Sequence, residues 1–556
     1  MYKRLILLIF VLLFAAACAA PAGDSGATTT ETDSGASEAA GEEMAEPGEP
    51  KQGGILTYGL VGDPPALDPH TQRGAADATV KAQVYDTLLT WDREMNAVPR
   101  LAESWEIVDD TTIQFKLREG VKFHDGSEMT AEDVVFSYER IQNPDTGATA
   151  AGFLKDVTFE VIDTYTVQMN LPAPNAAIFQ NLCRGDTAIV SKAWVEGGAD
   201  LNQEMMGTGP FTYVGREPGV SLEIARNPDY FRAPLPYLDG VKFIPYADET
   251  AKVTAIRTGE IDFIDYVPWI DMDEIEGLAN AGELKFGSDK EALFMTLYMN
   301  PSEPPFNDKR VRQAVAWGID RDAVGRSIFF GRGNALTGSF IPASFLGYDP
   351  SLDGTYGYDQ EKAMALLDEA GWRDEDGDGV REAYGVEGVD DGTPLMINFL
   401  ATNLYAMHYN LAEFAQAMLS EIGVGGTIEL VDWPTRTQRR LDVLPWEIQA
   451  DGLGQSVTDP SFMDIYYHST RGQWPSRLHF AVPEVDEMLD QALASYDDAE
   501  RAALYNEVDK MMLDEAYFVY VWRREQGEAM QPYVMGYSHM FGTFSYLTLP
   551  EWWLDK

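Results

Sequence analysis

The chain has 556 residues, with 41 Lys+Arg against 90 Asp+Glu and a formal net charge of −49. This length allows about three to five domain-sized units, and a 45% hydrophobic composition is enough to bury a large core. The surplus of acid argues against nucleic-acid binding, because a phosphate backbone must be neutralised by Lys and Arg. It also argues against broad adhesion to anionic lipids. Either a solvated, self-repelling surface, which we favour, or an acidic recognition face explains the acid.

The cysteines and motifs argue against common enzyme chemistries. Cys18 and Cys183 are the two cysteines. Cys18 lies in the N-terminal targeting region, so we expect no internal disulfide and no cysteine-based metal site. The sequence has no His-Glu-x-x-His, no Gly-x-Ser-x-Gly, no phosphate loop and no Gly-x-Gly-x-x-Gly. We therefore expect a protein that is not an enzyme.

Residues 1–18 are typical of a lipoprotein signal. Two basic residues precede an apolar run from Leu5 to Ala17, which is shorter than the roughly 20 residues that span a bilayer. The tetrapeptide Ala15-Ala16-Ala17-Cys18 resembles a bacterial lipobox, in which the cysteine is acylated and becomes the first mature residue. The alternative is ordinary cleavage, with Cys18 incidental. We predict a signal peptide at 1–17 and lipidation at Cys18.

The next segment predicts a tether. Residues 19–52 are rich in Ala, Gly, Ser, Thr, Glu and Pro, and Met44 is their one large apolar side chain, so they cannot form a core. We expect residues 18–52 to be a disordered acidic tether. No second long apolar run follows. The folded part is thus expected outside the cytoplasm, anchored by its N-terminal lipid at the outer face of the cell membrane or in the periplasm.

Strand and helix patterns then alternate along the chain. Strands with β-branched and aromatic residues are predicted at 54–58, 112–117 and 166–171. A helix is predicted after Thr130 as N-cap, with an apolar face through Ile141. Apolar periodicity predicts further helices at 311–319, 359–370 and 411–422, the last two ending at glycines. Interleaved strands and helices over this length indicate an α/β protein.

Several motifs resemble one family, in the same order along about residues 53–530. They are Pro65–Pro69, Val84–Leu89, Leu101–Trp105, Phe115–Gly126, Thr130–Val134, Gly207–Phe211, Arg226–Phe231, Gly259–Asp262, Lys309–Ala314, Asp459-Pro460 and Pro483–Asp486. The chain resembles the extracytoplasmic solute-binding proteins of peptide-type ABC importers (family 5, which includes oligopeptide and dipeptide binders). The segment from Leu101 to Val134 carries the most specific part of this resemblance.

The resemblance implies a two-lobed fold of the periplasmic-binding-protein type II class, large and cluster C-like. Lobe one is expected at 53–298 plus 521–556, with an inserted subdomain at about 99–206. Lobe two is expected at 299–520. The chain is expected to cross between lobes near Leu297–Asn300 and again near 518–528.

The resemblance also implies a function. A small solute (an oligopeptide, an oligosaccharide or a related compound) is expected to be captured between the lobes and delivered to the permease of an ABC transporter. Closure follows from differential affinity, since the ligand contacts both lobes only in the closed state. We expect a monomer, no required cofactor and no nucleic-acid partner. The alternative is a secreted acidic enzyme or an adhesion protein on an unrelated fold.

The ligand pocket departs from the peptide-binding pattern. Oligopeptide binders hold the peptide ammonium with a carboxylate, because a buried ammonium needs a charged partner. Ser456 occupies that position in this chain, and Arg73 replaces a glutamate of the opening loop. A slip in the alignment would leave Asp451 or Asp459 as substitutes. The expected ligand-contact residues are Arg73, Ala75, Trp446, Leu453, Gly454, Gln455 and Ser456.

Other residue types leave the ligand class open. Aromatic side chains stack on sugars, and arginines clamp carboxylate or phosphate groups. Each tryptophan can instead pack in the core, and each arginine can pair with an acid at the surface. The side chains concerned are Trp269, Trp433, Trp446, Trp474, Arg73, Arg436, Arg439, Arg440, Arg471 and Arg477.

Residues 374–382 read Asp-Glu-Asp-Gly-Asp-Gly-Val-Arg-Glu. This order matches an EF-hand-type calcium loop, with Gly379 at the sharp turn. Position twelve is Gly385 rather than a bidentate glutamate. One interpretation is a structural calcium ion, with ligands from Asp374, Asp376, Asp378, Val380 and Glu382. The other is an acidic surface turn without metal.

Overall fold

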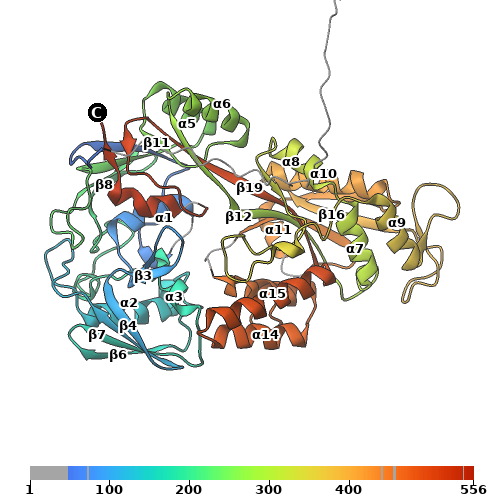
Figure 1. Cartoon of the computed structure of the whole chain (residues 1–556), viewed down its shortest axis with the longest axis horizontal. Coiled ribbons are helices and arrows are strands. Elements are labelled where there is room, and N and C mark those ends of the chain that lie inside the picture. The colour runs from blue at the N-terminus through green and yellow to red at the C-terminus, as the bar shows by residue number, and fades with distance from the viewer. Residues whose placement is uncertain (1–47, 72–73, 440–442, 455–458, 543) are drawn as a thin grey trace, which may run out of the picture. The chain divides into compact units, whose positions relative to one another are not determined.

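Two long strands form the middle of a large mixed sheet (Figure 1). In this computed structural model, β12 (Lys285–Met299) and β19 (Phe518–Met530) pair antiparallel, from Lys285 against Met530 to Tyr298 against Phe518. Residues 48–556 form one compact unit. The structure describes residues 48–71, 74–439, 443–454, 459–542 and 544–556.

The sheet continues on both sides of these two strands. Within the described residues its order is β17-β16-β18-β12-β19-β11-β1-β10-β9-β8, and β13 also pairs with β19. β1 runs parallel to β10 and β11, and β16 runs parallel to β17 and β18. The remaining strands are β1 (Ile55–Leu60), β8 (Phe211–Glu217), β9 (Ser221–Arg226), β10 (Gly240–Pro245), β11 (Phe263–Ile264), β13 (Gly333–Ala335), β16 (Met396–Thr402), β17 (Gly425–Val431) and β18 (Glu447–Gly454).

The strands β1 and β8–β11 build the core expected for lobe one. Leu56, Tyr58, Phe243 and Phe263 are fully or almost fully buried in one cluster, and burying each such side chain contributes roughly 1.5–3 kcal/mol. The C-terminal residue Trp552 packs in the same cluster. The associated elements are α1 (Ala75–Val84), α5 (Glu249–Thr258), α6 (Trp269–Asn280), β20 (Val534–Met535), η6 (Phe544–Glu551) and β21 (Trp553–Leu554).

A four-stranded antiparallel sheet, ordered β4-β5-β7-β6, has a hydrophobic cluster of its own. Ile113 and Phe115 of β5 pack with Val134 and Tyr138 of α2. Asp133 accepts a hydrogen bond from the backbone N–H of Thr130 at 2.9 Å, which confirms the predicted helix start. The elements are β2 (Leu89–Trp91), β3 (Ala97–Pro99), β4 (Ala102–Asp109), β5 (Thr112–Leu117), α2 (Ala131–Gln142), β6 (Thr158–Asp163), β7 (Thr166–Asn170), α3 (Ile178–Asn181) and α4 (Lys192–Glu196).

The elements expected for lobe two cover both faces of β12. Successive strand residues point to opposite faces, so Met295 and Leu297 enter one cluster while Phe294 and Tyr298 enter another. The first cluster involves α7 (Lys309–Gly318), α8 (Arg321–Ile328), α9 (Gln360–Glu369) and α10 (Ala406–Ser420). The second involves α12 (Met463–Tyr467), α13 (Gln473–Leu478), α14 (Pro483–Ala494) and α15 (Asp498–Glu515).

Short elements complete the described chain. They are α11 (Trp433–Arg439), β14 (Trp372–Arg373), β15 (Glu382–Ala383) and the 3-10 turns η1 (Pro69–Thr71), η2 (Pro144–Thr146), η3 (Gly185–Thr187), η4 (Pro350–Leu352) and η5 (Pro460–Phe462).

The α/β class, the three strands and the four helices predicted from sequence are confirmed, with shifts of a few residues at their ends. The predicted lobe and subdomain boundaries stay predictions, and we keep the names lobe one and lobe two for the two sets of elements. Among the described residues, no helix has the length and apolar character needed to cross a membrane.

Candidate functional site

A cavity of about 690 Å³, which we call the cleft cavity, lies where distant parts of the chain meet. It takes residues from the β2–β3 turn and α3 of lobe one, from the central strand β12 and from lobe two. Its volume falls within the range of roughly 300–1,000 Å³ that small-molecule sites occupy. Its lining comes from residues 93–96, Gln180, 289–290, 344–346, Asp459-Pro460, Asp498, Arg501 and Phe541.

The two lobes touch directly beside this cavity. The backbone N–H of Ala176, just before α3, donates to the carbonyl of Leu493 on α14 at 2.8 Å. The hydroxyl of Tyr496 donates to the carbonyl of Asp110 at 3.1 Å. The Tyr496 ring also lies 6.2 Å from the ring of Phe179. Both hydrogen bonds join the region around the four-stranded sheet to α14 and the α14–α15 connection, which lie side by side (Figure 1).

Asp459 in the cavity wall is already neutralised. Its two carboxylate oxygens each accept a hydrogen bond from Arg501 Nη2 at 2.7 Å, and both side chains are more than nine-tenths buried. Asp459 also accepts from the backbone N–H of Ser461 and begins the turn η5. A second contact of Arg501, at 3.6 Å, reaches the exposed Asp498. This wall of the cavity is therefore an internally balanced ion pair.

A histidine connects the cavity to the central strands. His539 Nδ1 lies 3.1 Å from Glu528 of β19, and Nε2 lies 3.5 Å from Asp289, which lines the cavity on β12. Burial alone would lower the pKa of His539, but hydrogen bonds and charge from Asp289 and Glu528 raise it to about 9. The imidazole is therefore charged at neutral pH and neutralises part of the acid on these strands.

The structure describes four of the seven expected ligand-contact residues. Leu453 and Gly454 end β18, directly before residues 455–458, and Leu453 pairs with Phe294 of β12. Ala75 begins α1. Trp446 packs edge-on against Trp372 at 5.8 Å and lines a separate pocket of about 370 Å³ beside β16–β18. Arg73, Gln455 and Ser456 lie outside the described residues, and their role in ligand binding stays a prediction.

The two substitute acids are both occupied. Asp451 Oδ2 lies 3.0 Å from Arg436 Nη2 and 3.3 Å from the hydroxyl of Tyr298. Asp459 is bound by Arg501. Neither acid is therefore a ready acceptor for the ammonium of a peptide, because each already neutralises a buried guanidinium.

Two arginines that face Asp451 differ from the sequence-based interpretation. We expected Arg436 to pair at the surface, but its side chain is only 1% exposed. Arg524, on β19, did not stand out in the sequence. The sequence feature that could have identified Arg524 is the pair of adjacent arginines Arg523-Arg524, which interrupts a strand that is otherwise largely buried. Two of the other arginines pair with acids as expected: Arg439 with Glu429 and Glu447, and Arg471 with Asp464 and Asp490.

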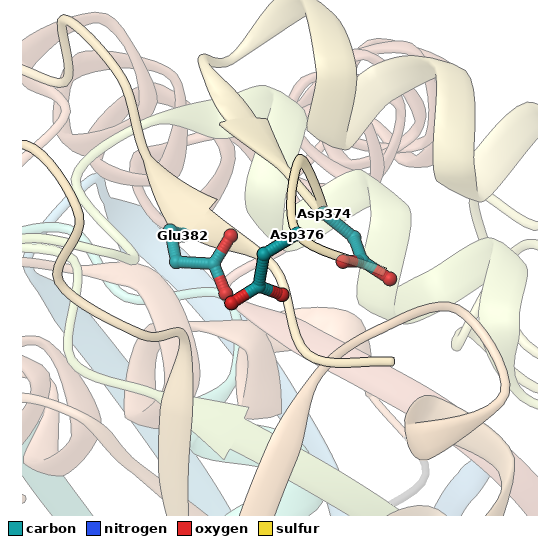
Figure 2. A group of neighbouring side chains, drawn as sticks. All are labelled: Asp374, Asp376 and Glu382. Carbon is teal, nitrogen blue, oxygen red and sulfur yellow. The ribbon is translucent and has the colours of Figure 1, made fainter. Parts of the chain in front are cut away.

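The acidic loop after β14 brings three carboxylates together (Figure 2). One carboxylate oxygen from each of Asp374, Asp376 and Glu382 lies within 4.8 Å of the others. Asp378 is not part of this group, and its carboxylate accepts instead from the backbone N–H of Val380 at 2.8 Å. Burial and the neighbouring acids raise the pKa of Glu382. Three of the five expected calcium ligands therefore converge.

Comparisons with known proteins agree with this architecture. A family model described as "Bacterial extracellular solute-binding proteins, family 5 Middle" matches residues 96–474. The oligopeptide-binding protein AppA of Bacillus subtilis (strain 168) is 26% identical over 523 residues, covering 92% of this chain and 93% of AppA. The AgaA structure from A. tumefaciens R10, in complex with agropinic acid, is 30% identical with a TM-score of 0.73, covering 90% of this chain and 99% of AgaA.

A solved structure of AppA from Bacillus subtilis, in complex with a nonapeptide, matches with a TM-score of 0.71 at 24% identity. It covers 91% of this chain and 100% of the AppA chain. This likeness confirms the fold.

Proposed function

This chain belongs to the bacterial extracellular solute-binding proteins of family 5, and we propose that its cleft encloses a small solute of about the size of a short peptide. As a member of the family it acts outside the cytoplasm and binds solute for an ABC importer. The members of this family are binding proteins. The size of the ligand is inferred from the cavity of about 690 Å³, which residues of both lobes line.

The relatives suggest two kinds of ligand. AppA is named for oligopeptides, and AgaA was solved with agropinic acid. In this chain Asp451 and Asp459 are both held by arginines. An ammonium without a charged partner in a closed cleft costs several kcal/mol. We therefore expect ordinary free peptides to bind poorly through Asp451 or Asp459, and we place the ligand among peptides with a blocked or unused N-terminus and related small organic solutes.

Calorimetry tests this function directly. The protein is titrated with pooled di- to pentapeptides, with the same pools after N-terminal acetylation, and with oligosaccharides, while small-angle scattering follows lobe closure. We expect at least one class to bind and to close the lobes, and acetylation to leave peptide binding unchanged. Submicromolar binding of a free peptide that is lost on acetylation would show that an acid of the cleft does hold the ammonium.

The N-terminal anchor is a further part of the proposal. The lipobox-like Ala15–Cys18 lies outside the described residues, so support comes from sequence alone. Cys18→Ala should abolish membrane association and leave unprocessed precursor, because the acidic tether offers no other attachment. Fractionation of spheroplasts measures both. Processed Cys18→Ala protein in the membrane fraction would contradict the lipoprotein proposal.

Calcium binding by the 374–382 loop is the last part of the proposed function. Asp374, Asp376 and Glu382 offer hard oxygen atoms at close range (Figure 2). Glu382 Oε2 is buried and has no hydrogen-bond partner within the described chain. A divalent cation would offset the repulsion among the three carboxylates. We propose a structural ion bound by these residues, with the ligand roles of Asp378 and Val380 left as predictions.

Thermal unfolding with calcium and with chelator tests the ion, since a ligand of the native state raises stability by mass action. Calcium should raise the melting temperature of the wild type but not of the double variant Asp376→Asn/Glu382→Gln. Glu387→Gln, an exposed acid on the same segment, is the matched control and should respond like the wild type. Equal melting curves in calcium and chelator would leave an acidic turn without metal.

A further inference from the structure

Arg436 is buried without enough partners to satisfy it. It extends from α11, and its Nη2 donates to the hydroxyl of Tyr298 at 2.7 Å and pairs with Asp451 at 3.0 Å. Its Nε and Nη1 are buried and have no hydrogen-bond partner among the described residues. A buried donor that is left unpaired costs stability, so this arrangement calls for a physical reason.

Arg524 is a second guanidinium of the same kind, on β19. Its Nη1 contacts the sulfur of Met407 at 3.3 Å, and its guanidinium lies 5.9 Å from the ring centre of Trp269 on lobe one. Its Nε is buried and has no partner within the described chain. Burial lowers the pKa of Arg524 to about 10, and the nearby Tyr266 and Asp451 oppose this shift only in part. Within the described chain, Arg524 is therefore a cation without an ion-pair partner.

The start of α10 adds positive potential at the same place. This 15-residue helix begins after Tyr405, which provides no side-chain cap, so the positive end of the helix dipole lies at its first turn. Met407 of that turn contacts Arg524, and Nδ1 of the next residue, His408, lies 3.7 Å from Asp451. Arg436 therefore pairs with Asp451 directly, and Arg524 lies against the helix start whose His408 is close to the same aspartate.

The charges among the described residues of this cluster do not balance. Arg436 pairs with Asp451, and Arg524 forms no ion pair with a described acid, in a chain whose net charge is −49. An uncompensated buried cation is costly, although acids for pairing are abundant in this sequence. Asp451 also lies in β18, two residues before Leu453 and Gly454, which are expected to contact ligand. Trp269 brings lobe one to the same point.

We propose that Arg524 and Arg436 form a subsite for an anionic group of the transported solute, a carboxylate in the first place, which supplies the missing counter-charge between the lobes. This inference rests on the proposed function, since it assigns the chemistry of one group of the bound solute. Arginine suits the role because its planar fork binds carboxylates through two hydrogen bonds. The carboxylate has two sources, the C-terminus of a peptide or a sugar-derived acid such as agropinic acid.

Native mass spectrometry of the full chain tests the subsite with a defined mixture. The mixture holds N-acetyl-oligoalanines with a free carboxylate, the same compounds as C-terminal amides, agropinic acid, its methyl ester and neutral cello-oligosaccharides. We expect the wild type to retain a free carboxylate from the peptide or the agropinic acid arm and to discriminate against its blocked partner. Arg524→Met should bind the retained compound about 30-fold more weakly or worse, because one partner of a buried charge pair is lost.

Two further variants and one melting measurement separate an effect on binding from an effect on folding. Arg326→Gln removes the same charge at an exposed site on α8 and should bind like the wild type. Arg524→Lys retains charge without the fork and should bind with intermediate affinity. The melting temperature of Arg524→Met without ligand should equal or exceed that of the wild type, because an unpaired buried cation is removed. A fall of several degrees, or Arg524→Lys binding no better than Arg524→Met, would indicate a structural role and overturn the proposal.

The outcomes also distinguish this proposal from the proposed function. Retention of amides, ester or neutral sugars by the wild type, with no preference for a carboxylate, would overturn the anionic subsite and leave solute binding intact. If the wild type retains no compound of any class, the result counts against both the anionic subsite and the proposed solute-binding function.

Discussion

Two buried arginine–aspartate sites near the cleft use the same chemistry in opposite ways. At Asp459, one arginine satisfies one aspartate through two hydrogen bonds of 2.7 Å. Near Asp451, Arg436 pairs with the aspartate while Arg524 lies against Met407, and three nitrogens of the two arginines have no hydrogen-bond partner within the described chain. The first site is complete in itself, whereas the second requires another anion. The difference separates an ion pair that stabilises the fold from a site that we propose binds ligand.

This comparison also explains why the charge of a residue says little about its role. Arg501 and Arg436 are both almost fully buried, and neighbouring charge raises the pKa of each against the effect of burial. Arg524 differs because burial lowers its pKa to about 10. A cation whose protonated form is disfavoured in the protein is stabilised when an anion arrives, so it contributes to ligand affinity rather than to folding.

The largest expected effect is a loss of stability when the Asp459–Arg501 pair is broken. Arg501→Met leaves Asp459 buried without its partner and should lower the free energy of unfolding by about 3–5 kcal/mol. Asp498→Asn removes only the exposed contact of Arg501 and should change it by less than about 1 kcal/mol. Urea unfolding of both variants measures the difference. A loss below about 1 kcal/mol in Arg501→Met would show that the pair does not hold the fold.

A smaller loss of stability is expected when Arg436 is removed from Asp451. Arg436→Met also removes a partner from a buried aspartate, but Arg524 remains close enough to interact with Asp451. We expect a loss of about 2–3 kcal/mol by the same unfolding measurement. If Arg436→Met is as harmful as Arg501→Met, Arg524 does not compensate, and the contrast between the two sites disappears.

The third effect concerns His539, which neutralises acid on β12 and β19. Its pKa of about 9 lies above the ordinary value of 6.5. Its contribution to stability is therefore complete below pH 6.5 and is lost as pH rises through about 9. We expect the wild type to lose about 3 kcal/mol over this range, and His539→Gln to lose less.

Unfolding at a series of pH values measures this dependence. His479→Asn, at an exposed histidine, is the matched control and should retain the slope of the wild type. Identical slopes in His539→Gln and the wild type would mean that the contacts with Asp289 and Glu528 do not stabilise the charged imidazole.

Local features of the fold were predictable from the sequence. Thr130 and Asp133 define the start of α2, and Asp359 caps α9 by accepting from Lys362, because both contacts join residues three apart. The acidic loop was predictable for the same reason, since Asp374, Asp376 and Glu382 lie within nine residues. The exclusion of Asp378 from that group was not predictable, because it depends on the geometry of the turn.

The two arginine sites were beyond sequence reasoning because their partners are far apart in the chain. Arg501 reaches Asp459 across 42 residues, and Arg436 reaches Tyr298 across 138 residues. Register in the sheet decides these contacts, since β18 lies on one side of β12 and β19 on the other. The predicted roles of Arg73 and Ser456 lie outside the described residues and depend on the ligand experiments above.

A crystal structure of the wild type with its retained solute tests the central claim most directly. The account predicts an anionic oxygen of the solute within about 2.7–3.0 Å of guanidinium nitrogens of Arg524 and Arg436, with the Asp459–Arg501 pair unchanged. A solute whose anionic group lies elsewhere, or a neutral solute with both guanidiniums still unpaired, would contradict it.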